Sequence, residues 1–513
     1  MEYLHLFKTK TEHDSFYGGN KYKEPWLAYT RDNALVTGNK SYDYKDKYLT
    51  LSALDDGEIT ITIPSVIDQN YATSLSYSKD KSNWTETVVD NTEQTITIPV
   101  SNGDDVYLKG VAKAWCNTDA GFGAYIDSSA NINASGNIMS LLYGDNFKDK
   151  TTFPNGSNYV FGQLFLNNTH LINAENLILP ATTLVQTCYN SMFFGCTALT
   201  TAPVLPATTL SDGCYSSMFQ GCSSLTTAPE LPATTLANGC YSDMFKGCTS
   251  LTVAPELPVT TLAIGCYYEM FKGCSSLTAA PELQATILAM HCYDSMFYEC
   301  TSLTTAPELP ATTLADGCYY YMFFGCTSLT TAPELPATTL TDSCYGYMFQ
   351  GCSSLTTAHK LPATTLANGC YTHMFLDCSS LTTAPELPAT TLADSCYEYM
   401  FYDCTSLTAA PELPATTLAD DCYSSMFWLC TSLTAAPELP ATTLAYGCYS
   451  SMFRSCEKLN SITMLATDIS ASDCLTDWVD GVASTGTFTK AASMNSLTSG
   501  ASGIPSGWTV VNK

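Results

Sequence analysis

The chain has 513 residues, of which 45% are hydrophobic and only 13% charged, and its formal net charge at pH 7 is -27. A chain of this length is too long to fold around a single hydrophobic core. It must therefore form several domains or an array of repeats in which each unit contacts only its neighbours. The negative charge excludes nucleic-acid binding through phosphate contacts, and no run of about 20 apolar residues is present that would insert into a membrane.

Residues 1–46 are polar with scattered aromatic side chains such as Tyr3, Phe16 and Trp26. We interpret them as an N-terminal arm that attaches the chain to a larger assembly. The first 20 residues contain no apolar stretch of signal-peptide length. If Met1 is the native start, we therefore expect no export by an ordinary cleaved signal.

Residues 47–115 alternate between apolar and polar side chains in short runs such as YLTLSAL and EITITIP, which turn residues separate. Five to seven short strands in this span predict an all-β, immunoglobulin-like sandwich. Cys116 is the only cysteine outside the repeats described below, so the disulfide of true antibody domains is excluded. Residues 116–163 are expected to form a strand-rich linker that covers the first repeat.

A 26-residue repeat occupies most of the remaining chain. The pair Met-Phe recurs 11 times at this period, from Met192 to Met452, and one unit reads CYSSMFQGCSSLTTAPELPATTLANG, from Cys214 to Gly239. Cys214, Met218 and Cys222 are spaced as on one face of a short helix, and the stretch that follows is extended because its prolines block a helix. The fold class predicted is therefore an α/β leucine-rich-repeat solenoid with a short helix and a short strand in each coil.

The solenoid is expected to span 164–480, because atypical units flank the regular ones. Leu166 and Trp478 take the position of the methionine in these terminal units, as capping of a solenoid requires. Residues 481–513 are expected to form a C-terminal cap, in which TGTFTK and GWTVVNK supply closing strands.

The unit MFxGCxSLTTAPxLP, with its 26-residue period, resembles the BspA-like leucine-rich repeats, the 26-residue repeat of bacterial surface proteins. That resemblance implies a right-handed solenoid with a role in adhesion or surface attachment. The opening segment EYLHLFKTKTEHDSFY also resembles N-terminal segments of proteins from gut Bacteroidales and their phages.

All of the 24 cysteines except Cys116 follow the repeat in two series. Members of one unit lie eight residues apart, which is too far for a disulfide within a helix, and the spacing is not that of a zinc site. We expect two ladders of buried thiols. Disulfides between coils and a metal site are the alternatives.

No catalytic, metal or cofactor site is predicted. The six histidines share no phase of the repeat, and no nucleophile is paired with them at a recognisable spacing. The glutamates recur every 26 residues from Glu230 to Glu438, interrupted by Lys360. We expect them to form a solvated edge, with calcium binding as the alternative.

The units differ mainly at positions two, three and six residues after the first cysteine, which a helix would turn towards solvent. Aromatic side chains gather there, and exposed aromatic rows are typical of binding surfaces. The candidate binding residues are Tyr268, Tyr298, Tyr320, Tyr321, Phe324, Tyr347, Tyr399, Tyr402 and Trp428. Packing against another copy of the chain and unselected variation are the alternatives.

These features favour a non-enzymatic recognition or adhesion protein whose partner is a host-surface protein or a glycan. Because thiols persist in a reducing compartment, we expect a phage virion appendage, attached through its N-terminal segment. A bacterial cell-surface adhesin and a structural fibre or spacer subunit, which could form a homo-oligomer, are the alternatives.

Overall fold

The computed structural model describes residues 27–29, 35–37, 40–42, 44–68, 70–90, 92–117 and 122–513, with side chains from residue 44 onward. The predicted arm over 1–46 lies almost entirely outside these residues. Within it, β1 (Leu27–Tyr29), β2 (Leu35–Thr37) and β3 (Lys40–Tyr42) form a small antiparallel sheet.

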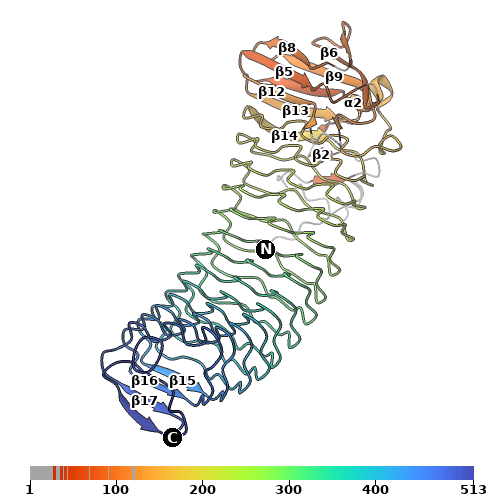
Figure 1. Ribbon diagram of the computed structural model, residues 1–513. Coiled ribbons are helices and arrows are strands. Elements are labelled where there is room, and N and C mark those ends of the chain that lie inside the picture. Colours follow the sequence, from red (N-terminus) through yellow and green to blue (C-terminus); the bar gives the residue numbers. More distant parts are fainter. Residues whose placement is uncertain are drawn as a thin grey trace, which may run out of the picture. The chain divides into compact units, whose positions relative to one another are not determined.

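The chain divides into two compact units (Figure 1). The first comprises Met1–Thr209 with Pro229–Pro232, and the second comprises Leu210–Ala228 with Ala233–Lys513. The first unit holds the β-rich region and the earliest coils, and the second holds the regular repeats and the C-terminal strands.

The β-rich region of the first unit is built from two main sheets. One has the order β12-β5-β8, and the other has the order β14-β13-β4-β9-β6-β7. Buried apolar side chains recur at alternate positions, for example Leu49 and Leu51 in β4 and Ile59 and Ile61 in β5, as expected where two sheets enclose one core. The strands are β4 (Leu49–Ala53), β5 (Gly57–Ile63), β6 (Ala72–Ser78), β7 (Thr85–Val88), β8 (Gln94–Val100), β9 (Asp105–Ala112), β12 (Tyr125–Ser128), β13 (Ile132–Asn137) and β14 (Leu171–Ile178).

The predicted all-β region is present, but its strand order departs from the immunoglobulin pattern. In that pattern the first two strands share a sheet, whereas here β4 and β5 lie in different sheets. The segment 116–163 also contributes more than a linker, because β12 pairs with β5 and β13 pairs with β4. It holds, in addition, the short strands β10 (Cys116–Asn117) and β11 (Phe122–Gly123), the helix α2 (Ser140–Tyr143) and the 3-10 turn η1 (Gly144–Asn146).

Strand β14 connects this region to the first coil. It pairs in parallel with β13 on one side, and Asn173 within it bridges to Thr201 of the following coil on the other. The hydrogen-bonding edge of the first coil is therefore covered by a strand of the β-rich region, which removes an exposed sheet edge.

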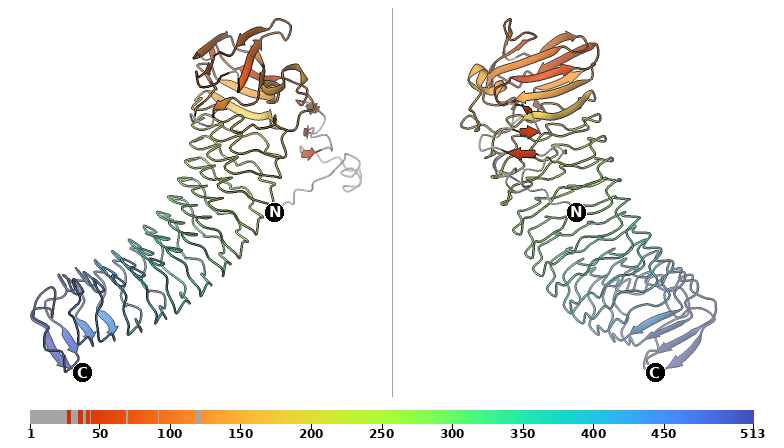
Figure 2. Two further views of the ribbon diagram at one scale, coloured as in Figure 1. Left: turned by 45° about the vertical axis from the view of Figure 1, so that its right-hand side comes forward. Right: turned by 180° about the vertical axis from the view of Figure 1, so that it is seen from behind.

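The predicted short helix of each coil is wrong. Alternate backbone N–H groups bond within the coil and across coils: Met218 N–H donates to the Tyr215 carbonyl at 3.2 Å, and Phe219 N–H donates to the Met244 carbonyl of the next coil at 2.9 Å. Among the described residues, α2 is the only α-helix. This half of each coil is a run of successive tight turns without a helical ribbon (Figure 2). Half of its backbone donors connect one coil to the next.

Positive φ angles at every fourth residue produce these turns. In one unit they fall at Gly213 (60°), Ser217 (55°) and Gly221 (76°), and the same three positions recur along the array. A right-handed helix has no place for such a residue, since its φ is negative throughout. The four-residue period of the turns therefore places Cys214, Met218 and Cys222 on one side, as a helix would.

The other half of each coil is extended and carries few regular strands. Successive coils are connected there by isolated parallel bridges, such as Thr227 with Val253 and Thr331 with Thr357. The prolines of this segment lack the N–H group that a continuous ladder needs. The predicted strand is thus reduced to single bridges in most coils, although β15 (Ala435–Leu439) is a full strand.

Identical side chains stack in ladders inside the solenoid. The methionine of every Met-Phe pair from Met192 to Met452 is fully buried, which confirms the predicted core stripe. Buried phenylalanine rings stack from coil to coil at 5.5–5.8 Å, as Phe297 and Phe323 do at 5.7 Å. All 24 cysteines are buried with free thiols, and Cys248 Sγ donates to the Phe219 carbonyl at 3.1 Å.

The C-terminal end of the second unit closes with a parallel sheet in the order β15-β16-β17-β18. The strands expected in TGTFTK and GWTVVNK are present as β17 (Thr487–Lys490) and β18 (Thr509–Asn512), after β16 (Ser461–Met464). Trp478, in the methionine position, is fully buried and donates its Nε1–H to the Gly503 carbonyl at 2.9 Å. The larger indole ring thus fills the end of the core.

Candidate functional site

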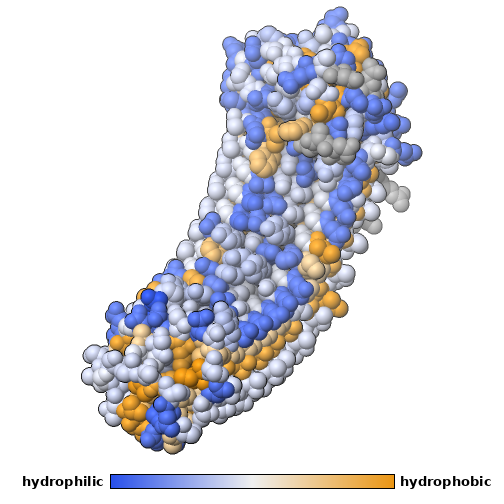
Figure 3. Space-filling view, in the orientation of Figure 1, coloured by the Kyte–Doolittle hydropathy of each residue, from blue (hydrophilic) through white to orange (hydrophobic). Residues whose placement is uncertain are grey.

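Positions two, three and six residues after the first cysteine form three columns on the turn side of the second unit. Because each position of the unit recurs on successive coils, side chains of one kind produce stripes along the array (Figure 3). Column one contains Asp294 and Tyr320, column two contains Ser295 and Tyr321, and column three contains Tyr298 and Phe324.

Aromatic side chains of these columns touch one another over successive coils. Tyr298 stacks on Phe324 at 4.3 Å, Tyr321 on Tyr347 at 4.5 Å, and Tyr347 on His373 at 4.3 Å. The contacts continue through Tyr399 and Tyr402 to Trp428. We call the aromatic row Tyr298, Tyr320, Tyr321, Phe324, Tyr347, His373, Tyr399, Tyr402 and Trp428.

A cation lies over the ring at each end of the aromatic row. Lys272 Nζ lies 4.2 Å from the centre of the Tyr298 ring, and the Arg454 guanidinium lies 5.0 Å from the centre of Trp428. Each cation also has a carboxylate partner: Glu269 at 2.8 Å from Lys272, and Asp480 at 3.5 Å from Arg454. The chain therefore covers both terminal rings with its own charged side chains.

All nine predicted binding residues lie in these columns, and all nine are half-buried rather than fully exposed. The sequence predicted rings that face solvent, whereas in the structure the rings pack against one another and so bury part of their surface. Eight belong to the aromatic row, and Tyr268 stands apart from it beside Asp294. Whether these residues bind a ligand remains a prediction.

Column two holds its side chains in an unfavourable backbone conformation. Tyr321, Tyr347, His373 and Tyr399 have φ angles of 53° to 58°, in the left-handed region. Most other coils place Ser or Asp there, and bulky residues are uncommon in this region. Aromatic residues at four successive coils therefore keep a conformational cost that points to a role outside folding.

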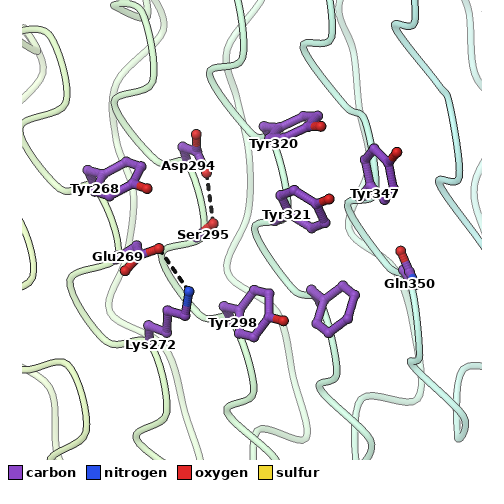
Figure 4. Close-up of a pocket in the computed structure, with 11 residues that line it drawn as sticks. Tyr268, Glu269, Lys272, Asp294, Ser295, Tyr298, Tyr320, Tyr321, Tyr347 and Gln350 are labelled. Carbon is purple, nitrogen blue, oxygen red and sulfur yellow. Dashed lines mark hydrogen bonds and ion pairs between the residues drawn. The ribbon is translucent and has the colours of Figure 1, made fainter.

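An open hollow of about 450 Å³ lies where the aromatic row begins (Figure 4). Asp294 and Ser295 lie between Tyr268 and Glu269 of the preceding coil and Tyr320 and Tyr321 of the following coil. The hollow exists because column two carries the small Ser295 where the next coil carries Tyr321. Its lining also includes Lys272, Tyr298, Phe324, Tyr347 and Gln350.

Two buried carboxylates are fixed around the hollow. Glu269 pairs with both Lys246 and Lys272. Burial alone would raise the pKa of Glu269, but the two lysines outweigh it and hold that pKa below its ordinary value. Asp294 accepts hydrogen bonds from Ser295 Oγ at 2.8 Å and pairs with His291 Nδ1 at 2.9 Å, and burial raises its pKa.

The group Ser295, Asp294 and His291 does not form a nucleophile–base pair. Ser295 donates to Asp294, and the histidine contacts the same aspartate from its other side. A serine nucleophile needs a base to accept its proton, and here the carboxylate stands where the imidazole would be required. The geometry favours binding over acyl transfer.

Several residues of the hollow, and His373 of the aromatic row, were missed as candidates from the sequence alone. Glu269, Lys272 and His373 occupy the same variable columns as the predicted aromatics, so their register was the available signal. Ser295 and Gln350 gave no signal in the sequence, because serine and glutamine also occupy these columns on other coils. The role of Ser295 depends on which side chains flank it on neighbouring coils.

Within the part of the chain that the structure describes, no group of three or more His, Cys, Asp or Glu side chains is placed to hold a metal ion. The glutamate edge is partly paired, since Lys360 contacts Glu386 at 2.9 Å and Lys513 contacts Glu438 at 2.6 Å. Over the same described residues, no helix has the length and apolar character to cross a membrane.

The model of the BspA type leucine rich repeat region matches residues 141–278, 268–408 and 347–473, and so covers more than half of the chain. No curated protein matches the sequence. Among solved structures, a crystal structure of a TLR13–ssRNA13 complex is 12% identical with a TM-score of 0.24. The match covers 63% of this chain and 47% of that chain, so this chain spans about half the length of the solved relative.

Proposed function

This chain belongs to the BspA-type leucine-rich-repeat family, and we propose that it is a non-enzymatic recognition protein that holds its ligand against the aromatic row. Leucine-rich repeats of this family suggest protein interaction or adhesion and are typically found on surfaces or outside cells. The partner that we propose is a protein or a glycan on a host surface.

The observation that carries this proposal is the distribution of aromatic residues among otherwise near-identical coils. The extended half of the unit hardly varies, whereas column two places Tyr321, Tyr347 and Tyr399 in a conformation that tyrosine rarely adopts. Tyrosine offers a large contact area with little loss of side-chain entropy, and its hydroxyl adds a hydrogen bond. A continuous, half-buried aromatic row is thus suited to binding.

For localisation we propose the surface of a phage virion, with attachment through the N-terminal segment. The 24 buried thiols support this, because reduced cysteines suit a protein that folds in a reducing compartment. A bacterial cell-surface adhesin is the second candidate, which the repeat family favours. Mass spectrometry of purified virions separates the two, since an adhesin would be detected only in bacterial outer-surface fractions.

The binding proposal is tested with the triple variant Tyr320→Ser, Tyr321→Ser and Phe324→Ser. We expect cell attachment to weaken at least about 10-fold, while the melting temperature changes little because the rings are only half-buried. The matched control is Ser216→Ala, Ser217→Ala and Gln220→Ala, which changes the same three columns on a coil that carries no aromatic residue in them. Unchanged attachment of the triple variant would exclude the aromatic row.

A purely structural fibre or spacer subunit makes a different prediction. There the aromatic row would pack against another copy of the chain, and assembly would rise with protein concentration. Size-exclusion chromatography over a range of concentrations measures this. A concentration-dependent oligomer that the triple variant abolishes would favour the structural role over recognition.

A further inference from the structure

The hollow at the start of the aromatic row has the shape of a slot between coils. Phe271, Phe297 and Phe323 of the three coils involved stack beneath it in steps of 5.7 Å. Glu269 and Tyr321 therefore belong to coils whose cores are about 11 Å apart, with only Ser295 between them in column two. Tyr321 is covered by Tyr347 on one side, and its other side borders the slot.

The width of the slot indicates what kind of ring it accepts. A planar ring between two others needs about 7 Å between the outer planes, given carbon contacts of roughly 3.5 Å. Two coil steps of about 11 Å leave more room than a planar ring needs and suit a thicker, non-planar ring with C–H groups on its faces, such as a pyranose chair. The hollow also continues past Tyr321 to Gln350, so it is longer than one sugar ring (Figure 4).

Acceptor atoms that line the slot can take further hydrogen bonds. Gln350 Oε1 is buried and accepts no hydrogen bond within the described part of the chain. Asp294 receives one hydrogen bond at each oxygen, and a carboxylate accepts about four. Buried acceptors without partners are uncommon in proteins, so a ligand that supplies hydroxyl groups would satisfy them.

Charge decides between a neutral ligand and a charged one. Lys246 and Lys272 already neutralise Glu269, so this carboxylate requires no cation from outside, and Asp294 already has hydrogen-bond contacts with His291 and Ser295. An anionic ligand would meet the repulsion of a chain with a net charge of -27. The slot therefore favours a neutral ligand that donates hydrogen bonds over a charged one.

We propose that the slot over Ser295 binds a neutral oligosaccharide, with one pyranose ring between Tyr321 and Glu269. Hydroxyl groups of this ring donate to Asp294, and those of a further ring donate to Gln350. This inference rests on the proposed recognition function and names its ligand class. The tyrosines of the aromatic row beyond the slot extend the contact along the saccharide.

The test applies the full chain to an array that holds neutral oligosaccharides, their sialylated and sulfated counterparts, and polylysine. We expect binding to neutral saccharides, and a loss of at least about 10-fold in Ser295→Tyr, which continues the ladder of column two into the slot. Tyrosine is already accommodated at the equivalent position by Tyr321, with a φ of 54°. Ser217→Tyr, at the same register position but far from the slot, should bind as the unsubstituted chain does.

A second variant keeps the test informative if Ser295→Tyr folds poorly. Gln350→Met preserves the size of the side chain and removes the orphaned acceptor, and we expect roughly 5-fold or greater loss of saccharide binding. Binding only to polylysine or only to anionic glycans would overturn the inference. So would neutral-saccharide binding that both folded variants retain.

The same variants distinguish failure of this inference from failure of the proposed function. Cell attachment that depends on the aromatic row, without any saccharide bound on the array, would leave recognition intact and point to a protein partner, and the slot assignment would be wrong. Absence of cell attachment by the unsubstituted chain would overturn the recognition function itself and the inference with it.

Discussion

Tyr321 stacks on Tyr347 of the next coil with the ring centres 4.5 Å apart, closer than the 5.6–5.7 Å between the buried rings of Phe323 and its neighbours. Surface rings that approach more closely than the coil spacing must lean towards one another. Both residues also have positive φ angles, of 54° and 58°. The contacts between rings therefore determine how the side chains of the aromatic row lean, and the turns of the backbone determine where those side chains begin.

A first prediction contrasts two tyrosines that lie two residues apart. Tyr347→Asn removes stacking worth about 0.5–1.5 kcal/mol per ring pair but places a residue that tolerates positive φ, so we expect the free energy of unfolding to change by about 1 kcal/mol or less. Tyr345→Asn leaves an amide in the buried tyrosine ladder, where Tyr345 is 1% exposed, and should cost about 3 kcal/mol or more. Denaturant titration of both variants measures the difference, and equal losses would contradict it.

The second prediction concerns the core. Phe323 is fully buried between Phe297 and Phe349, at 5.7 Å and 5.6 Å. Phe323→Ala should cost about 3–5 kcal/mol locally, because the neighbouring coils are fixed by their own hydrogen bonds and cannot close the cavity. Amide hydrogen exchange of coils near residue 323 should accelerate, while exchange in the C-terminal sheet stays as it was. Uniform acceleration along the array would show that the coils do not unfold independently.

Many features of this core were predictable from the sequence, and the turns were not. The regular recurrence of Met-Phe predicted the buried stripe, and Trp478 predicted the closed end. Over the nine residues from Cys214 to Cys222, however, a four-residue turn period and a 3.6-residue helix period place the same side chains inside. The discriminating signal was glycine at Gly213 and Gly221, since glycine is unfavourable within a helix.

A third prediction follows from the buried thiols. Burial raises the pKa of Cys248 and Cys266 from 9.0 to about 12. Thiols of the unfolded chain ionise from pH 9 upward, while the buried thiols of the folded chain stay neutral. The contribution of the buried thiols to the free energy of unfolding is therefore fully present below pH 9 and is lost as pH rises towards 12. Between pH 9 and 12, each such thiol should lower the free energy of unfolding by roughly 1.4 kcal/mol per pH unit.

Denaturation midpoints at pH 8, 9, 10 and 11 measure this loss. The double variant Cys248→Ala and Cys274→Ala should show a shallower fall than the unsubstituted chain, because two of the ionising groups are gone. A midpoint that stays constant up to pH 11 would contradict the thiol ladder.

His373 supplies a fourth prediction. Burial between Tyr347 and Tyr399 lowers its pKa to about 4. An unfolded histidine takes up its proton near pH 6.5, so the contribution of the neutral ring to stability is present above pH 6.5 and is lost as pH falls through 4. Nuclear magnetic resonance titration should find His373 still neutral at pH 5.5, and His373→Gln should lose less stability between pH 6.5 and 4. A His373 titration near pH 6.5 would show that the ring is open to water.

The alternating N–H bonds between coils also make the length of the array adjustable. Every coil offers its neighbours the same donors and acceptors, so a gene that gains or loses one 26-residue unit by unequal recombination still encodes a chain whose coils fit together. Excision of residues 360–385 would bring Tyr347 against Tyr399 and shorten the stack by one step of about 5.7 Å. The reach of the molecule and the order of side chains along its binding surface can thus change by insertion and deletion, without substitution of any residue in the core.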